Sequence, residues 1–211
     1  MESMLPLLFA LGIGFSHAFE ADHLIAISNI VTRRTRSRLA MQDGIFWGLG
    51  HTTTILIVGL IVMLGKLAVN ESIFGYLEGL VGILLIGLGL VRLLRLLKSK
   101  KAPRPSDQSG HKVAYGVGLI HGLAGSGAVV LIALSEVKGV LTELFYLLSF
   151  GFGSIAGMLI AAGLFCLPFS KKFAAVKTVR QAMVIISSLL CIGYGGLILS
   201  NLVSWGFNTS F

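Results

Sequence analysis

The stretch MLPLLFALGIGFSHAFEADHLIAISNIV, residues 4–31, is long enough to cross a lipid bilayer, yet it carries four ionisable side chains at its centre: His17, Glu20, Asp22 and His23. A membrane span needs about 20 mostly apolar residues. An ionisable group placed in the middle of a bilayer costs at least ~2.5 kcal/mol for Asp on insertion scales. Such groups usually face an internal cavity and mark a pathway, so this stretch predicts both a membrane fold and a functional site.

The composition of the whole chain points to the same class of protein. Of the 211 residues, 55% are hydrophobic and 12% are charged, and the mean hydropathy is +0.90, well above that of ordinary soluble domains. We therefore predict an all-α polytopic membrane protein with six transmembrane helices. The expected spans cover residues 5–31, 44–65, 73–97, 113–135, 141–166 and 179–204.

Basic residues predict how the chain is oriented. Fifteen of the 17 Lys and Arg residues lie in or beside the connections after the first, third and fifth spans, and only Lys66 and Lys138 lie on the other side. Because basic residues accumulate on the cytoplasmic side, we expect a bacterial cell (inner) membrane protein with both termini outside. The net charge of +8 is then a topology signal and does not indicate a nucleic-acid partner. Cys166 and Cys191 lie inside spans without CxxC spacing, so we expect them to be apolar packing residues.

The two halves of the chain resemble each other. GIGFSHAFEADH (12–23) aligns with GVGLIHGLAGSG (116–127), so that Gly12, Gly14 and His17 match glycines and a histidine 104 residues later, His17 matching His121. GLGHTT (48–53) aligns with GFGSIA (151–156), and LIGLGL (85–90) with CIGYGG (191–196). Because each half contains three spans, consecutive copies must enter the membrane from opposite sides, as in many secondary transporters. We expect repeats at 1–98 and 113–211, joined by a cytoplasmic linker at 99–112.

The polar cluster in the first span does not fit a straight helix. At ~100° per residue, His17, Glu20 and His23 fall within an arc of about 120°, whereas Asp22 lies about 100° further round. One alternative is that the helix unwinds near Ala21, so that His17, Asp22 and His23 converge. The other is that Asp22 stays outside the ligand set and orients a histidine. A purely structural polar network is the remaining interpretation.

Neutral imidazoles with a carboxylate suit Ni, Co, Zn, Cu(II) or Fe(II), whereas Mg and Ca prefer oxygen ligands. We predict a divalent transition-metal ion as cargo and no resident cofactor. His51 in the second span lies at nearly the same depth as His23. His121 lies at a similar depth, where it would complete or gate the site or instead form a hydrogen bond between helices. Glu20 and Thr52 are further accessory candidates. We expect His111 to be solvated in the linker, and Glu78, Glu136 and Glu143 to line an acidic entrance or a solvated mouth.

At these residues the sequence resembles the NiCoT family of nickel/cobalt transporters. HAFEADH (17–23) is similar to the family's His-x4-Asp-His signature helix, and LGHTTT (49–54) to its second motif, Leu-Gly-His-Ser/Thr-Thr. The family usually has Asp at the position of Glu20, Arg at that of Ser16, and often eight helices. The compact length is more similar to the short permease branch associated with urease. The resemblance implies uptake of Ni²⁺ or Co²⁺, metal ligation by His17, Asp22, His23 and His51, and a link to maturation of a nickel enzyme such as urease.

A secondary permease is therefore the leading interpretation, with a possible homo-oligomer as its assembled form. No phosphate-binding Gly-x4-Gly-Lys-Ser/Thr loop is present, so the chain shows no ATPase motif of its own. The alternative transporter is an efflux carrier for a divalent metal or other small solute, exchanging protons through His and Asp. An intramembrane metalloenzyme is a third class, but HAFEADH is not His-Glu-x-x-His and no separate nucleophile is evident, so we do not expect an enzyme.

Overall fold

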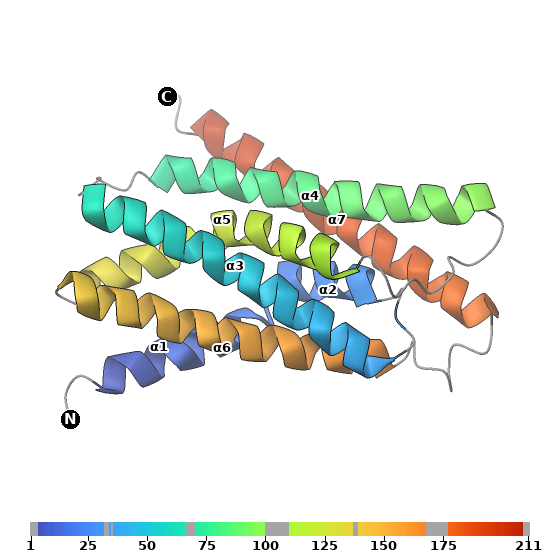
Figure 1. The fold of residues 1–211 in the computed structure, drawn as a ribbon. Helices are drawn as coiled ribbons and strands as arrows, with labels where there is room; N and C mark the ends of the chain where they lie inside the picture. The colour runs from blue at the N-terminus through green and yellow to red at the C-terminus, as the bar shows by residue number, and fades with distance from the viewer. Residues whose placement is uncertain are drawn as a thin grey trace.

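The computed structural model describes residues 4–31, 34, 36–65, 71–99, 110–136, 139–167 and 177–208. Seven helices occupy these ranges (Figure 1). They are α1 (Met4–His17), α2 (Ala21–Val31), α3 (Ser37–Gly65), α4 (Glu71–Ser99), α5 (Gly110–Glu136), α6 (Val140–Cys166) and α7 (Lys177–Asn208). The linker predicted at 99–112 falls largely outside the described residues.

The span predicted over 5–31 contains a break close to Ala21, as one of the two alternatives for its polar cluster anticipated. The helix ends at His17, turns through Ala18–Glu20, and restarts as α2 with a bend of 56° between the two parts. In the turn, the amides of Phe19 and Glu20 donate to the carbonyl oxygens of Ser16 and His17 at 2.9 and 3.0 Å. Because no straight helix can turn His17 and Asp22 to one side, the break brings these side chains toward the same region of the protein.

Four helical segments in the described part of the chain are long and apolar enough to cross a membrane, and the bent α1–α2 pair would make a fifth. The four are Ser37–Gly65, Gly75–Lys98, Val140–Cys166 and Gln181–Ser204. The fold is therefore that of a helical membrane protein, but the count found among the described residues is below the six predicted. The missing predicted span, 113–135, lies in α5, where the side chains of 124–136 are outside the described set.

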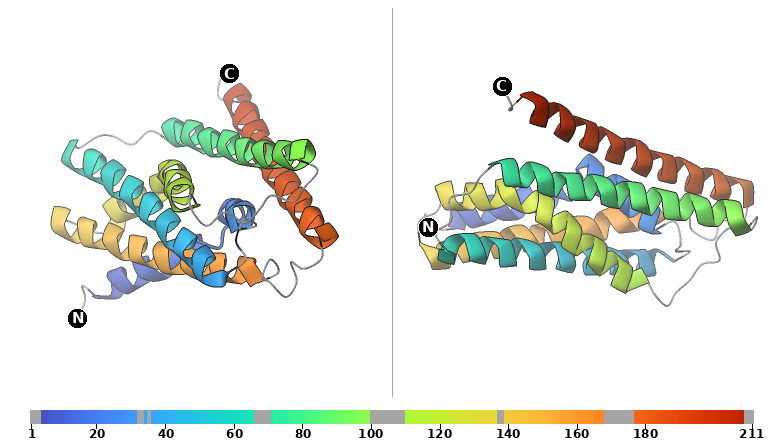
Figure 2. Two further views of the ribbon diagram at one scale, coloured as in Figure 1. Left: turned by 45° about the vertical axis from the view of Figure 1, so that its right-hand side comes forward. Right: turned by 90° about the horizontal axis from the view of Figure 1, so that it is seen from above.

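The helices form two layers with α2 and α5 between them (Figure 2). In one layer α3 packs against α6 and α1 against α6, while α4 and α7 form the other. Two glycines permit the closest approaches. A Cβ at Gly14 would collide with the backbone of Phe150 on α6, and a Cβ at Gly118 would collide with the backbone of Trp47 on α3. Large apolar side chains such as Phe9, Ile61 and Leu197 point outward, as expected for a surface in lipid.

A buried charged cluster joins the start of α3 to the start of α5. Arg34 donates to both carboxylate oxygens of Asp43, from Nε at 2.6 Å and from Nη2 at 2.9 Å, and each side chain is 1% exposed. His111 lies with Nδ1 2.8 Å from Asp43 Oδ1, and its ring stacks on Phe46. His111 thus lies in α5, which begins at Gly110, and not in the linker as expected; its side chain is 32% exposed and packs against α3. Cys166 and Cys191 are buried and free, as predicted.

Candidate metal site

Four histidines from four helices meet at the centre of the protein. His17 ends α1, His23 lies in the first turns of α2, His51 is on α3 and His121 on α5. The ring centroids of His17 and His23 are 4.5 Å apart, and that of His51 lies 5.2 Å from the first and 5.3 Å from the second. His121 lies 5.1 Å from His23. The break between α1 and α2 is what allows residues 17 and 23 to face each other.

The nitrogen atoms of these rings are buried without partners. His23, His51 and His121 are at most 1% exposed and His17 is 9% exposed. Among the described residues, the Nε2 atoms of all four, and Nδ1 of His51, have no hydrogen-bond partner. An unpaired buried polar group costs about 1–3 kcal/mol, so four of them in one cluster need an explanation. A ligand that accepts several nitrogen lone pairs at once would provide it.

Two of the rings contact a carboxylate through Nδ1, the nitrogen other than the unpartnered Nε2. Nδ1 of His17 lies 2.9 Å from Glu20 Oε1, and Nδ1 of His23 lies 3.0 Å from Asp22 Oδ1. When Nδ1–H donates to a carboxylate, Nε2 is left as a bare lone pair, which is the usual arrangement behind a metal-binding histidine. Asp22 thus contacts the ring of His23, which is the contact needed for Asp22 to orient a histidine. The helix is also broken before Ala21, so features of both alternatives for the polar cluster are present.

Three of the predicted site residues offer a matching set of ligand atoms. One nitrogen from each of His17, His23 and His51 lies within 4.8 Å of the other two. Nitrogens bound to one ion at about 2.0–2.1 Å can be at most ~4.2 Å apart, so only a small inward movement of the rings is needed. We refer to His17, His23 and His51 as the histidine site. A second set that meets the same criterion, Glu20, Asp22 and His23, shares one histidine with it.

The other accessory candidates have different surroundings. His121 lies beside His23 but does not belong to either ligand set among the described residues. Thr52 directs its hydroxyl group to the carbonyl oxygen of Gly151 at 3.3 Å, and so contributes to the contact between α3 and α6.

Sequence reasoning missed the two aromatic residues that wall the site. Trp47 stacks on His23, with ring centroids 5.4 Å apart, and meets the edge of His121 at 5.6 Å. Phe150 packs against His17 at 5.5 Å. Both residues immediately precede the segments aligned between the halves, GLGHTT and GFGSIA. Extending that alignment by one residue would have found them.

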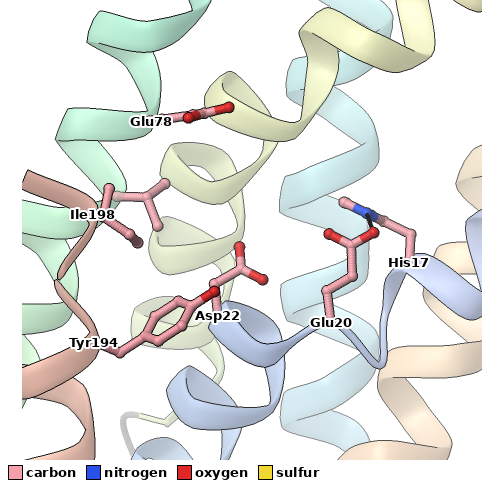
Figure 3. Close-up of a pocket in the computed structure, with 7 residues that line it drawn as sticks. His17, Glu20, Asp22, Glu78, Tyr194 and Ile198 are labelled. Carbon is pink, nitrogen blue, oxygen red and sulfur yellow. Dashed lines mark ion pairs between the residues drawn. The ribbon is translucent and has the colours of Figure 1, made fainter. Parts of the chain in front are cut away.

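A cavity of about 260 Å³ reaches the histidine site from one side (Figure 3). Its polar lining consists of His17, Glu20, Asp22, Glu78 on α4 and Tyr194 on α7, and its apolar lining of Val81 and Ile198. Of the predicted acidic entrance, Glu78 thus faces the cavity, Glu143 is not among its lining residues, and the side chain of Glu136 lies outside the described set. The cavity is therefore a polar route to the buried nitrogens of the histidine site.

Comparison with known proteins identifies similar chains. The protein is 35% identical over 205 residues to urease accessory protein UreH of Bacillus sp. (strain TB-90), which covers 92% of this chain and 89% of the relative. It is 33% identical over 100 residues to nickel transporter NicT of Mycobacterium tuberculosis, covering 43% of this chain and 27% of the relative. It is 25% identical over 126 residues to the high-affinity nickel transport protein of Cupriavidus necator, covering 56% and 36%. No family model and no solved structure matches the chain.

Proposed function

Because the chain belongs to the NiCoT family of nickel/cobalt transporters, in the short branch that includes urease accessory protein UreH, we propose that it is a secondary permease for the uptake of Ni²⁺, Co²⁺ or both. Two of these relatives are named as nickel transporters and the third as a urease accessory protein, and none of them is named as an enzyme. The chain is a multi-pass membrane protein and not an enzyme.

The observation that carries the proposal is the convergence of unpartnered buried nitrogens in the histidine site. Three imidazoles, two of them in contact with carboxylates, are borderline ligands that suit Ni²⁺ and Co²⁺. Alkaline-earth ions prefer oxygen-only sites and would gain little from these nitrogens. Since the histidines come from α1, α2 and α3, an ion bound between them would also hold these helices together.

An inverted repeat is the architecture that best fits such a carrier, and reciprocal packing supports it. Gly14 on α1 packs against Phe150 on α6, and their counterparts, Gly118 on α5 and Trp47 on α3, pack in the same way. The two histidines that correspond, His17 and His121, each contact one of these aromatic rings, at 5.5 and 5.6 Å.

A second pair of glycine contacts corresponds between the two halves in the same way. Gly153 on α6 packs against Leu11 on α1, and the counterpart Gly50 on α3 packs against Tyr115 on α5. We therefore propose six spans in two units, 1–98 and 113–211, with 99–112 as the cytoplasmic linker and α1–α2 together as one span. Both termini would lie outside the bacterial inner membrane, since the basic residues cluster on the opposite side.

A nickel-uptake assay tests the function directly. Cells that express the protein should accumulate radioactive ⁶³Ni²⁺, and His23→Ala or His51→Ala should remove most of that accumulation, because each leaves only two histidines at the site. His111→Ala is the matched control: it removes a histidine of α5 that lies outside the site.

Purified protein separates binding from transport. Equilibrium dialysis in detergent should show nickel bound by the wild type and the His111→Ala variant, and binding lost from His51→Ala. Uptake that survives both site substitutions would contradict the proposal. Cells that become more sensitive to nickel when the protein is removed would instead support the efflux carrier. For the partner, the similarity to UreH leads us to propose that the nickel supplied reaches urease maturation.

A further inference from the structure

The cavity beside the histidine site has its own set of metal-capable ligands. Glu20, Asp22 and Glu78 all line it, and Figure 3 shows their carboxylate groups directed into the space between α4 and the turn after α1. The whole chain has only nine acidic residues, so a third of them gather at one cavity, and no Lys or Arg is among its lining residues. We refer to these three residues as the outer site.

A nearby unpartnered atom distinguishes the outer site from an ordinary acidic cluster. His17 lines the same cavity, is 9% exposed, and has a buried Nε2 without a hydrogen-bond partner. In addition, the carboxylates of Glu20 and Asp22 lie within 4.8 Å of a nitrogen of His23. The cavity is therefore bounded by carboxylates toward α4 and by the imidazole of His17 toward the protein centre.

We infer that the outer site is a separate capture site for a hydrated divalent cation, which then passes to the histidine site. This inference rests on the proposed uptake function. A cavity of about 260 Å³ has room for an ion with several of its waters, since each water occupies ~30 Å³ in the liquid. Carboxylate oxygens bind such ions with little discrimination among metals, whereas the imidazoles behind them suit transition-metal ions such as Ni²⁺ and Co²⁺.

The ligand sets share His23, which provides a path between the two sites. An ion held by Glu20 and Asp22 is already within reach of His23, and from there the nitrogens of His17 and His51 are the next ligands. Glu78 is the residue that belongs to the outer site alone, because it has no contact with a histidine among those described and sits on a different helix. Its role is to raise the local concentration of cations and to hold the ion before it loses water.

The decisive experiment compares Glu78→Gln with Glu143→Gln. Glu143 is a matched control, since it is another glutamate in the first part of a membrane helix but does not line the cavity. Uptake of ⁶³Ni²⁺ is measured against nickel concentration in cells. We expect Glu78→Gln to raise the concentration for half-maximal uptake by about tenfold, as expected for loss of a focusing charge, with an unchanged maximal rate. Glu78→Asp should restore the wild-type value.

A competing ion gives a second readout. Mn²⁺ prefers oxygen ligands, so millimolar Mn²⁺ should raise the half-maximal concentration for the wild type and have much less effect on Glu78→Gln. The same Mn²⁺ should not displace nickel from the purified protein in equilibrium dialysis.

Two results would overturn the inference: kinetics of Glu78→Gln that match those of Glu143→Gln, or a lower maximal rate at an unchanged half-maximal concentration. Normal nickel binding by purified Glu78→Gln protein verifies that the variant is folded. Absence of uptake by the wild type would instead refute the proposed function itself, so the two failures are distinguishable.

Discussion

The ring of His23 is held on two sides, by the carboxylate of Asp22 at Nδ1 and by the face of Trp47. Together these contacts fix the orientation of the ring and of its Nε2 atom. A ligand that is already oriented loses less conformational freedom on binding, so residues of this kind contribute to affinity at the histidine site without touching the ion bound there. The same reasoning applies to Glu20 and His17, although Glu20 is largely exposed.

Asp22→Asn tests this positioning role. The amide keeps the size of the side chain but removes the charge that favours the Nδ1–H tautomer, so we expect nickel affinity to fall by about 10–100-fold, the usual effect of losing such a partner. Isothermal titration of purified protein with NiCl₂ measures it. Ser16→Ala, which changes an exposed neighbour of His17, should bind as the wild type does, and equal affinities for Asp22→Asn and Ser16→Ala would contradict the role.

At the scale of the residue, the sequence pointed to histidines that the structure brings together, but not to their surroundings. Motif spacing and depth along the helices were sufficient to single out His17, His23 and His51 as candidates, because both depend on local periodicity alone. Periodicity says nothing about which side chain of another helix lies opposite. The partner of His111, Asp43, follows from the packing of α5 on α3, and no pattern within either segment indicates it.

At the scale of the element, the break after His17 and the close helix contacts determine where the site can form. The helical arc of the polar residues was sufficient to raise local unwinding as an alternative, but not to place it at Ala18–Glu20, since the turn depends on backbone hydrogen bonds to Ser16 and His17. The contacts made through Gly14 and Gly118 then set the distance of α1 from α6 and of α5 from α3.

Alanine substitutions at these glycines test whether the close contacts between helices contribute to the stability of the protein. Gly14→Ala and Gly118→Ala each place a methyl group against the backbone of the neighbouring helix, so we expect each to destabilise the protein by about 1–3 kcal/mol, the usual cost of overpacking. Gly12→Ala and Gly116→Ala are matched controls, because nothing lies within 4 Å of a Cβ at either position. Thermal unfolding in detergent, followed by circular dichroism, provides the measurement.

Those controls should be neutral or slightly stabilising, since alanine is the better helix former. Equal midpoints for all four variants would show that the helices are not in close contact at these points. A loss confined to Gly14→Ala would show that the two halves do not pack reciprocally.

At the scale of the whole molecule, hydrophobicity was sufficient to predict a helical membrane protein, because lipid requires every backbone group to be bonded within a helix or a closed barrel. It was not sufficient to fix the number of spans, since the bent α1–α2 pair departs from a simple apolar run and the side chains of 124–136 in α5 lie outside the described set. The arrangement of the helices in two layers depends on contacts between residues far apart in the chain, such as Gly14 with Phe150.

The break after His17 also has an electrical consequence. α1 has 14 residues, or ~21 Å at 1.5 Å per residue, against a hydrocarbon thickness of ~30 Å. In the proposed orientation, with the N-terminus outside, an ion that reaches His17 would have crossed about two thirds of the insulating layer.

If the potential falls evenly, a divalent ion gains ~3 kcal/mol per 100 mV of inside-negative potential before it is bound. Nickel affinity measured from the outer side of energised vesicles should therefore exceed the value in detergent by up to about a hundredfold. The excess should disappear when an ionophore collapses the potential.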